Sequence, residues 1–178
     1  WQTMRGRGDI FVGFFERSLS MLNPDGRVGF ICADRWMRNQ YGAPLRAFVT
    51  DGFDVDHVWA MHDVDAFEAQ VSAYPAITVM SRRKQGSVVV AETTAEFGPT
   101  AANSLLEWAQ HGTSIDFSSK GAAAHRLPHW FSGSEMWPTG SPARLALIEL
   151  LADRFDPLHD PRTGTKVSTG VASGADSG

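Results

Sequence analysis

Residues 8–36 read GDIFVGFFERSLSMLNPDGRVGFICADRW, and the patterns in this stretch decide the fold. Apolar residues recur at spacings of three and four positions from Ile10 to Leu22, which predicts an amphipathic helix. Asp9 stands immediately before this helix, where an acidic side chain can cap the first turn. The stretch therefore begins with a helix that buries one face.

A turn and a strand are predicted directly after the helix. Asn23-Pro24-Asp25-Gly26 is typical of a tight turn, because proline presets one φ and Gly26 is free to take a positive one. Val28–Ala33 is continuously apolar, which indicates a strand of a parallel sheet covered on both faces. The polar and aromatic residues 34–42 are expected to form a loop at the carboxyl end of that strand, where open α/β sheets bind ligands.

The rest of the chain continues an α/β pattern and then becomes less regular. The expected elements are a short helix over 45–52, a second strand over 53–61, a third strand over 73–80 and a short outer strand over 87–91. Beyond Glu92 we expect a short helix near 105–109, a loop-rich aromatic stretch over 112–141 and a clearer helix over 145–155.

Composition limits the class of protein. The 178 residues are 43% hydrophobic and 20% charged, as in a globular protein, and no apolar run approaches the ~20 residues that span a membrane. The single Cys32 excludes a disulfide framework, and with no recognisable signal peptide we expect a reducing, cytoplasmic compartment. The chain opens on Trp1 and ends in a Gly- and Ser-rich tail, so we expect a fragment.

Charge is distributed unevenly. The net charge of −4 argues against a free-standing nucleic-acid-binding module, which usually carries a basic excess. Seven arginines nevertheless lie in the first 46 residues, whereas acidic residues crowd the stretch 51–68. Any contact with a polyanion should come from the arginines at positions 5, 7, 27, 35, 38 and 46.

The order of helix, strand, helix, strand and strand resembles the second half of a class I S-adenosylmethionine-dependent methyltransferase. Within that fold the chain looks most like the adenine-N6 DNA methyltransferases of the Eco57I and TaqI type. The resemblance covers roughly 5–92 and rests on the segments 8–17, 22–30, Asp34-Arg35-Trp36-Met37, Leu45-Arg46-Ala47-Phe48, Ala66-Phe67 and Ser72-Ala73. Residues 166–176 also resemble the opening of the target-recognition domain in this family.

The resemblance implies an α/β fold, namely the carboxyl-terminal half of a Rossmann-like seven-stranded methyltransferase sheet with a terminal antiparallel hairpin. It implies a catalytic part over 1–92, a family-specific helical and loop extension over 93–160, and a linker or the start of a target-recognition domain over 161–178. The implied activity is methyl transfer from S-adenosylmethionine to N6 of adenine in double-stranded DNA, within a restriction-modification or phage-defence system. The implied partners are the DNA and a restriction nuclease domain or subunit.

Two aromatic side chains match positions of the family that hold the substrates. The target adenine must leave the duplex before its amine can be methylated, and an aromatic face then holds the flipped base. Phe67 matches that stacking position, although it could also be a core residue at the edge of a hairpin. Phe14 matches an aromatic beside the adenine ring of the cofactor, but it also lies on the apolar stripe of its own helix.

Five residues after the first strand are candidates for DNA contact, and the arginines among them could pair with phosphates. These residues are Arg35, Trp36, Arg38, Asn39 and Tyr41. The alternative is a solvated loop in which Trp36 fills a gap in the core.

Several expected motifs are missing from the sequence. Residues 23–26 lack the second proline and the aromatic of an Asn-Pro-Pro-aromatic tetrapeptide, and no acidic-x-aromatic-x-Gly-x-Gly cofactor loop is found. We therefore expect both motifs upstream of Trp1 and no activity from this chain alone. His125 and His129 are four apart, but Pro128 interrupts a helical face and no third ligand has suitable spacing, so no metal site is expected.

Two alternatives remain open. One is a methyltransferase of the same fold that acts on RNA or on a protein glutamine. The other is a non-catalytic DNA-binding or assembly subunit that kept the sheet and lost the chemistry.

Overall fold

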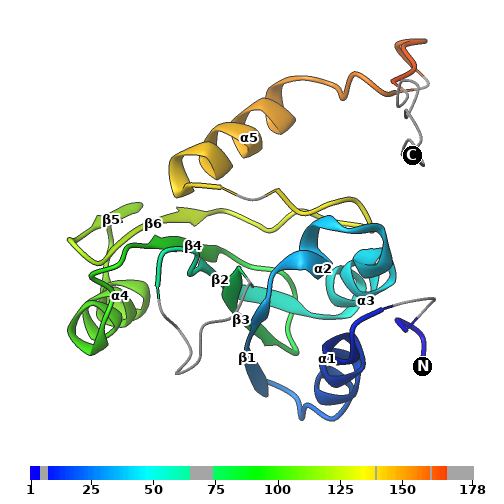
Figure 1. The fold of residues 1–178 in the computed structure, drawn as a ribbon. Helices are drawn as coiled ribbons and strands as arrows, with labels where there is room; N and C mark the ends of the chain where they lie inside the picture. The colour runs from blue at the N-terminus through cyan, green and yellow to red at the C-terminus, as the bar shows by residue number, and fades with distance from the viewer. Residues whose placement is uncertain (5–7, 65–73, 139, 161, 168–178) are drawn as a thin grey trace, which may run out of the picture.

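The computed structural model describes all residues except 5–7, 65–73, 139, 161 and 168–178. The strands are β1 Arg27–Ala33, β2 Asp54–Ala60, β3 Pro75–Ser81, β4 Val88–Thr93, β5 Asp116–Ser118 and β6 Ala122–Leu127. The helices are α1 Ile10–Ser20, α2 Arg35–Arg38, the 3-10 turn η1 Gln40–Gly42, α3 Ala43–Gly52, α4 Pro99–His111 and α5 Pro142–Arg154. Together the described strands form one mixed sheet with helices around it (Figure 1).

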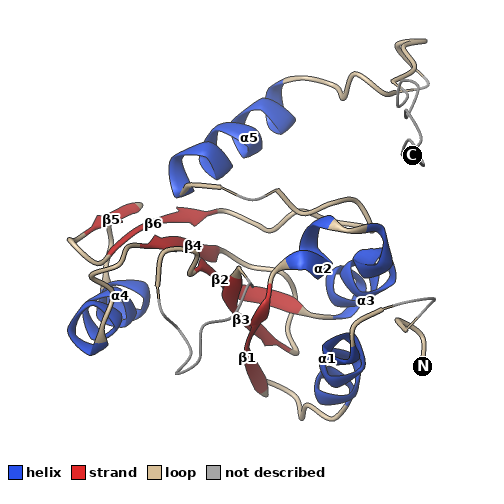
Figure 2. Ribbon diagram, viewed as in Figure 1, coloured by secondary structure: helices blue, strands red, loops and turns tan. Residues whose placement is uncertain are grey.

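The strand order in the sheet is β1-β3-β2-β4-β6-β5 (Figure 2). β2 and β3 are antiparallel, as predicted for the hairpin, but the pair lies inside the sheet and not at its end, because β3 also pairs antiparallel with β1 and β2 pairs parallel with β4. β4 was expected to be an outer strand, but it lies inside the sheet, parallel to β2 and antiparallel to β6. The β5–β6 hairpin forms within a stretch that was expected to be loop, since neither of its short strands contains an apolar run that would have predicted it.

β1 differs from its prediction as a strand covered on both faces. It lies at the edge of the sheet and pairs with β3 alone among the described strands. Its residues alternate between exposed and half-buried. One face, with Phe30 and Cys32, packs on the core, whereas Ile31 on the other face is 44% exposed.

The two faces of the sheet bury separate hydrophobic clusters. Along β4, Val88 and Val90 join the cluster formed with α1, α3 and the start of α5, whereas Val89 and Ala91 join the cluster formed with α4. This alternation follows from the two-residue period of a strand. Residues of the predicted extension, beyond Glu92, thus share both clusters with the first half of the chain.

A chain of aromatic rings links α1 to the segment that follows β6. Phe15 packs on Trp36 with ring centroids 5.1 Å apart, Trp36 on Trp137 at 4.8 Å, and Trp137 on Trp130 at 5.2 Å. All four rings are buried. The segment 130–137 is therefore part of the same core as the first helices.

The predicted helix over 10–22 is confirmed by α1, but its ends differ in detail from the prediction. Asp9 is the N-cap residue, yet its side chain makes no capping hydrogen bond and accepts one from the Tyr41 hydroxyl at 3.1 Å. In the turn that follows, Asp25 takes the positive φ of 62°, not Gly26. No helix of the described residues is both long and apolar enough to cross a membrane.

The buried carboxylate of Glu16 fastens the amino-terminal residues to α1. It accepts hydrogen bonds from the backbone N–H groups of Gln2 and Thr3, each at 2.8 Å, and from the Thr3 hydroxyl at 2.6 Å. Burial raises the pKa of Glu16, but these hydrogen bonds outweigh burial, so the pKa lies below its ordinary value of 4.5.

This lowered pKa predicts a pH-dependent effect of Glu16→Gln. The stabilisation is present above the pKa of the unfolded state and is lost as the pH falls through the lower pKa of the folded state. We expect the substitution to reduce the free energy of unfolding by about 1–2 kcal/mol at pH 7 and by less at pH 3. Urea unfolding at both pH values measures the difference, and an equal loss at both would contradict the role of the charge.

Candidate functional site

Asp34 lies at the carboxyl end of β1 and is the centre of a small charged cluster. The residue is 2% exposed, so its carboxylate needs partners. Arg38 Nη2 donates to its Oδ1 at 2.6 Å, and His62 Nε2 lies 3.0 Å from its Oδ2. Because Arg38 is four residues further along, the α2 turn itself brings the guanidinium to the carboxylate.

The same aspartate holds both ends of the β2–β3 connection. His62 comes just after β2 and bonds to the Asp34 side chain, whereas the carbonyl of Tyr74, just before β3, accepts from the Asp34 backbone N–H at 2.9 Å. The His62 and Tyr74 rings also pack together, with centroids 4.8 Å apart. The connection between them contains Phe67, which lies outside the described residues.

The segment 34–42 is not the loop that was predicted. It forms α2 and η1, because buried contacts override a sequence with no clear periodicity. Gly42 is needed here, because a Cβ at this position would overlap the carbonyl oxygen of Trp36. The guanidinium of Arg46 lies against the same carbonyl, to which its Nη1 donates at 2.5 Å.

The candidate DNA-contacting residues fall into two groups. Arg35 and Asn39 are exposed and the Arg38 side chain is 40% exposed, so all three reach the surface beside the carboxyl end of β1. Trp36 is completely buried, and this corrects the expectation of a DNA contact, since its ring fills the core between Phe15 and Trp137.

Tyr41 is half-buried and its hydroxyl donates to Asp9. Burial, with a further contribution from Asp9, raises the pKa of Tyr41 to about 12, so its hydroxyl stays protonated at neutral pH. The Tyr41 hydroxyl is thus already hydrogen-bonded to Asp9, the residue before α1.

The arginines of the first 46 residues are not equivalent. Arg46 was expected to be available to a polyanion, but it is 2% exposed and all its hydrogen bonds go to backbone carbonyls. Arg27 lies at the far end of β1, where it faces Asp56 at 3.9 Å. Arg5 and Arg7 are outside the described residues. Arg35 and Arg38 are therefore the arginines of this group that the structure places at the candidate site.

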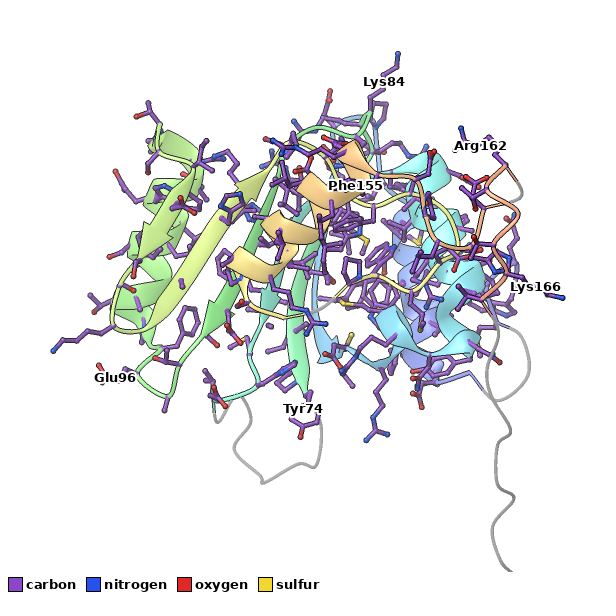
Figure 3. All side chains as sticks on the ribbon, turned by 90° about the horizontal axis from the view of Figure 1, so that it is seen from above. Tyr74, Lys84, Glu96, Phe155, Arg162 and Lys166 are labelled. Carbon is purple, nitrogen blue, oxygen red and sulfur yellow. The ribbon has the colours of Figure 1, made fainter. Side chains whose placement is uncertain are left out.

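Figure 3 shows how the two ends of the sheet differ. Tyr74 lies at the end where the β2–β3 connection leaves the sheet, and Lys84 lies at the opposite end. The basic run from Arg82 to Lys84 is thus remote from Asp34. Within the candidate site, the charged side chains are the Asp34–Arg38 ion pair and Arg35 beside it.

Phe14 does not belong to the buried face of its helix. Its ring is 57% exposed, whereas the neighbouring Phe15 is completely buried with Val12 and Leu19. The helical period explains this difference, because Val12, Phe15 and Leu19 share one face and Phe14 lies about 100° away from Phe15. The ring is open to stack against a planar ligand.

Sequence reasoning missed the central role of Asp34 and His62. The signal that could have identified Asp34 is its position directly after an apolar strand, at the end of the sheet where ligands bind. His62 occupies the equivalent position after β2, whose direction along the sheet is the same as that of β1. Only pairing across β3 brings these two positions together.

Cys32 has no catalytic character in this arrangement. Burial raises the pKa of its thiol to about 11, and the nearby Asp34 carboxylate acts in the same direction. The thiol is therefore protonated at neutral pH and is a weak nucleophile.

Residues 2–67 match the model of the family described as Eco57I restriction-modification methylase. The chain is 40% identical to the type II methyltransferase M.PaeR7I of Pseudomonas aeruginosa and 37% identical to M.XhoI of Xanthomonas vasicola, in each case over 99% of this chain. It spans 30% and 32% of the lengths of these two relatives.

The fold is also found among solved restriction-modification proteins. A modification subunit of a type I restriction enzyme from Vibrio vulnificus YJ016 superposes with a TM-score of 0.59 at 10% sequence identity, covering 84% of this chain and 35% of that one. At this identity the likeness concerns the fold alone. It agrees with the predicted fold class, a mixed α/β part of a Rossmann-like methyltransferase sheet, which is confirmed.

Proposed function

We propose that this chain is the carboxyl-terminal half of the catalytic domain of an adenine-N6 DNA methyltransferase of a restriction-modification or phage-defence system. The observation that carries the proposal is the 40% identity to a type II methyltransferase over 99% of the chain. The antiparallel pairing of β2 with β3 supports it, because the resemblance implies an antiparallel hairpin of these two strands. Residues 161–178 are proposed as the linker or start of a target-recognition domain.

The proposed DNA surface lies beside the carboxyl end of β1. Arg35 and Arg38 would contact phosphates, and Asn39 would lie beside them at the surface. The ion pair with Asp34 orients Arg38, whose side chain is still 40% exposed. Contacts of this kind position the duplex and weaken as salt concentration rises, but they do not read sequence.

Phe67 is proposed to stack on the flipped adenine. Phe67 lies in the connection between β2 and β3. Both ends of this connection are held beside the carboxyl end of β1, because His62 and Tyr74 are hydrogen-bonded to Asp34, and this supports the proposed role. A base taken out of the duplex loses its stacking partners, and an aromatic face can replace one of them. The chain's own contribution to the reaction would thus be to hold the base and the duplex in place.

Phe14 is proposed to contact S-adenosylmethionine. The residues present fit this group, because an exposed aromatic ring on α1 offers a flat apolar face for an adenine ring. When bound, S-adenosylmethionine supplies the methyl group. The sequence holds no glycine-rich cofactor loop, so Phe14 would supply one side of the cofactor site.

The function is tested with the complete protein whose reading frame includes this chain. The protein is incubated with unmethylated DNA and S-adenosylmethionine, and the digested nucleosides are analysed by mass spectrometry. Formation of N6-methyladenine is the expected result. Methylation of cytosine instead, or of RNA or protein alone, would contradict the proposal, and an absence of transfer would favour the binding-subunit alternative. The 178-residue chain alone should transfer no methyl group.

A pair of substitutions separates the two proposed aromatic roles. In the same complete protein, Phe67→Ala should lower methyl transfer about 5- to 150-fold, equivalent to the ~1–3 kcal/mol of base stacking on an aromatic ring, with cofactor binding unchanged. Phe14→Ala should weaken cofactor binding, measured by calorimetry, and Ile10→Ala, also exposed on α1, is its matched control. Equal transfer rates in wild type and Phe67→Ala would remove Phe67 from the base site.

A further inference from the structure

Three side chains outside the proposed methyltransferase site converge beside α5. His129 lies two residues after β6, and Glu149 and Asp153 lie four residues apart on α5. One ligand atom from each of the three lies within 4.8 Å of the other two. The separation in sequence between His129 and the two acids means that folding, not local spacing, brings this group together.

We propose that His129, Glu149 and Asp153 form a binding site for a divalent transition-metal cation, with Zn²⁺ as the reference ion. One imidazole nitrogen and two carboxylate oxygens are a donor set that suits Zn²⁺ and its first-row neighbours better than Mg²⁺ or Ca²⁺, which prefer oxygen ligands throughout. Three protein ligands leave a fourth position for water. Glu149 is half-buried and the other two are exposed, so a cation can enter from solvent.

The electrostatics of α5 favour a cation at this position. Glu149 and Asp153 are like charges at i and i+4 on one helix face, a pairing that destabilises a helix. Among the described residues no hydrogen bond or ion pair is formed by the side chains of Glu149, Asp153 or His129. A bound cation would replace this repulsion by attraction and would give all three groups a partner.

A metal at this site would hold the second half of α5, which is attached to the sheet only at its beginning. The buried residues of α5, Pro142 and Leu145, both lie in its first turn, and Figure 1 shows the helix lying over the sheet with its carboxyl end directed away from it. Glu149 and Asp153 are one and two turns beyond that anchor. A metal shared with His129 would fasten the second half of α5 to the segment that follows β6.

The two histidines that are four apart in the sequence, His125 and His129, do not bind together in this site. His125 lies on β6 and its Nδ1 is 2.6 Å from an Asp116 oxygen, so it is engaged within the sheet. His129 is beyond Pro128 and its candidate co-ligands come from α5. Glu149 and Asp153 are 20 and 24 residues away from His129 along the chain, beyond the reach of any local motif.

The test is a calorimetric titration of the tag-free, chelator-treated 178-residue protein with ZnCl₂. We expect one site, and we expect His129→Gln, Glu149→Gln and Asp153→Asn each to weaken it at least about tenfold. The matched control is the pair Glu107→Gln and His111→Gln, which alters an acid and a histidine at i and i+4 on α4 and should leave affinity unchanged. Circular dichroism of each metal-free variant establishes that the fold is retained.

A second measurement reports on the proposed role. Hydrogen exchange of the α5 amides after 149 should slow when Zn²⁺ is added to the wild type and should not change in Glu149→Gln. The proposal is overturned if the wild type binds no Zn²⁺, if all variants bind as tightly as the wild type, or if the α4 variants lose binding instead. Each of these outcomes is independent of methyltransferase activity, so it leaves the proposed function untouched.

Discussion

Arg46→Met should lower the free energy of unfolding by about 3–5 kcal/mol, because several buried backbone carbonyl oxygens lose the guanidinium that donates to them. Arg46 is 2% exposed. Its Nε donates to the carbonyl oxygens of Ser134 and Glu135 at 3.0 and 2.7 Å, and its Nη1 donates to those of Trp36 and Asn39 at 2.5 and 3.0 Å. Methionine fills similar space but leaves these oxygens without their donor, and each unsatisfied buried group costs about 1–3 kcal/mol unless water reaches it.

The physical character of Arg46 makes this effect specific. Burial lowers its pKa, and the nearby Glu135 opposes that shift, but an arginine stays charged in a protein. The dipoles of the bonded carbonyl groups balance the charge. These carbonyls come from two segments, 36–39 and 134–135, which the guanidinium holds together. Arg46→Lys keeps the charge and loses the planar fork, so it should fall between wild type and Arg46→Met.

Urea unfolding of the three proteins measures the effect. Thr50→Val, one turn further along α3, is a useful comparison, since the neutral Thr50 hydroxyl donates to the Arg46 carbonyl at 3.0 Å and accepts from the Gly133 N–H at 3.1 Å. A loss of less than about 1 kcal/mol in Arg46→Met would mean that water satisfies the carbonyl oxygens. Arg46 would then not be needed to hold the two segments together.

Trp137→Ala should be comparably destabilising, by about 3–5 kcal/mol. The ring is 2% exposed and packs edge-on against Trp36 and Trp130, with centroids 4.8 and 5.2 Å away. Removing it leaves a cavity beside Trp36, and the rigid neighbouring rings have little freedom to close it. The backbone N–H of Trp137 also donates to the Met37 carbonyl at 2.8 Å, so the segment is fastened to α2 by main chain and side chain together.

Met136→Ala is the matched control, because Met136 precedes Trp137 but is 66% exposed. It should change stability by less than about 0.5 kcal/mol. Thermal unfolding followed by near-ultraviolet circular dichroism would show both the loss of stability and the loss of the coupled tryptophan signal in Trp137→Ala. If the two variants unfolded at the same temperature, the aromatic chain would not be a main support of the core.

Much of the first half of the fold could be predicted because its signals are local. The apolar stripe of α1, the turn before β1 and the apolar run of β1 each fall within one short window, where period and turn chemistry suffice. The segment 34–42 could not be predicted in the same way. Its helical turns depend on Trp36 packing between rings from α1 and from the segment after β6, which no local pattern contains.

The candidate site was predicted by location more than by residue. A ligand site at the carboxyl end of β1 stays a prediction from the general rule for α/β sheets, and Arg35, Arg38 and Asn39 reach the surface there. Trp36 and Arg46 were misjudged for one shared reason. Tryptophan and arginine have both apolar and polar parts, so they occur on surfaces and in cores. Whether such a side chain is buried depends on the residues that pack around it in the folded protein.

By itself, the sequence determined the helix α1, the strand β1, the helix α3 and the β2–β3 hairpin, and with them the family resemblance of residues 5–92. These depend on periodicity, turn residues and motif order, all of which lie within a few residues of one another. The tertiary structure alone decided which side chains meet: Arg46 with carbonyls 88 and 89 residues away, Asp34 with His62, and His129 with the acids of α5. The physical reason is that such contacts arise from burial and strand pairing between distant segments, and a local pattern carries no record of them.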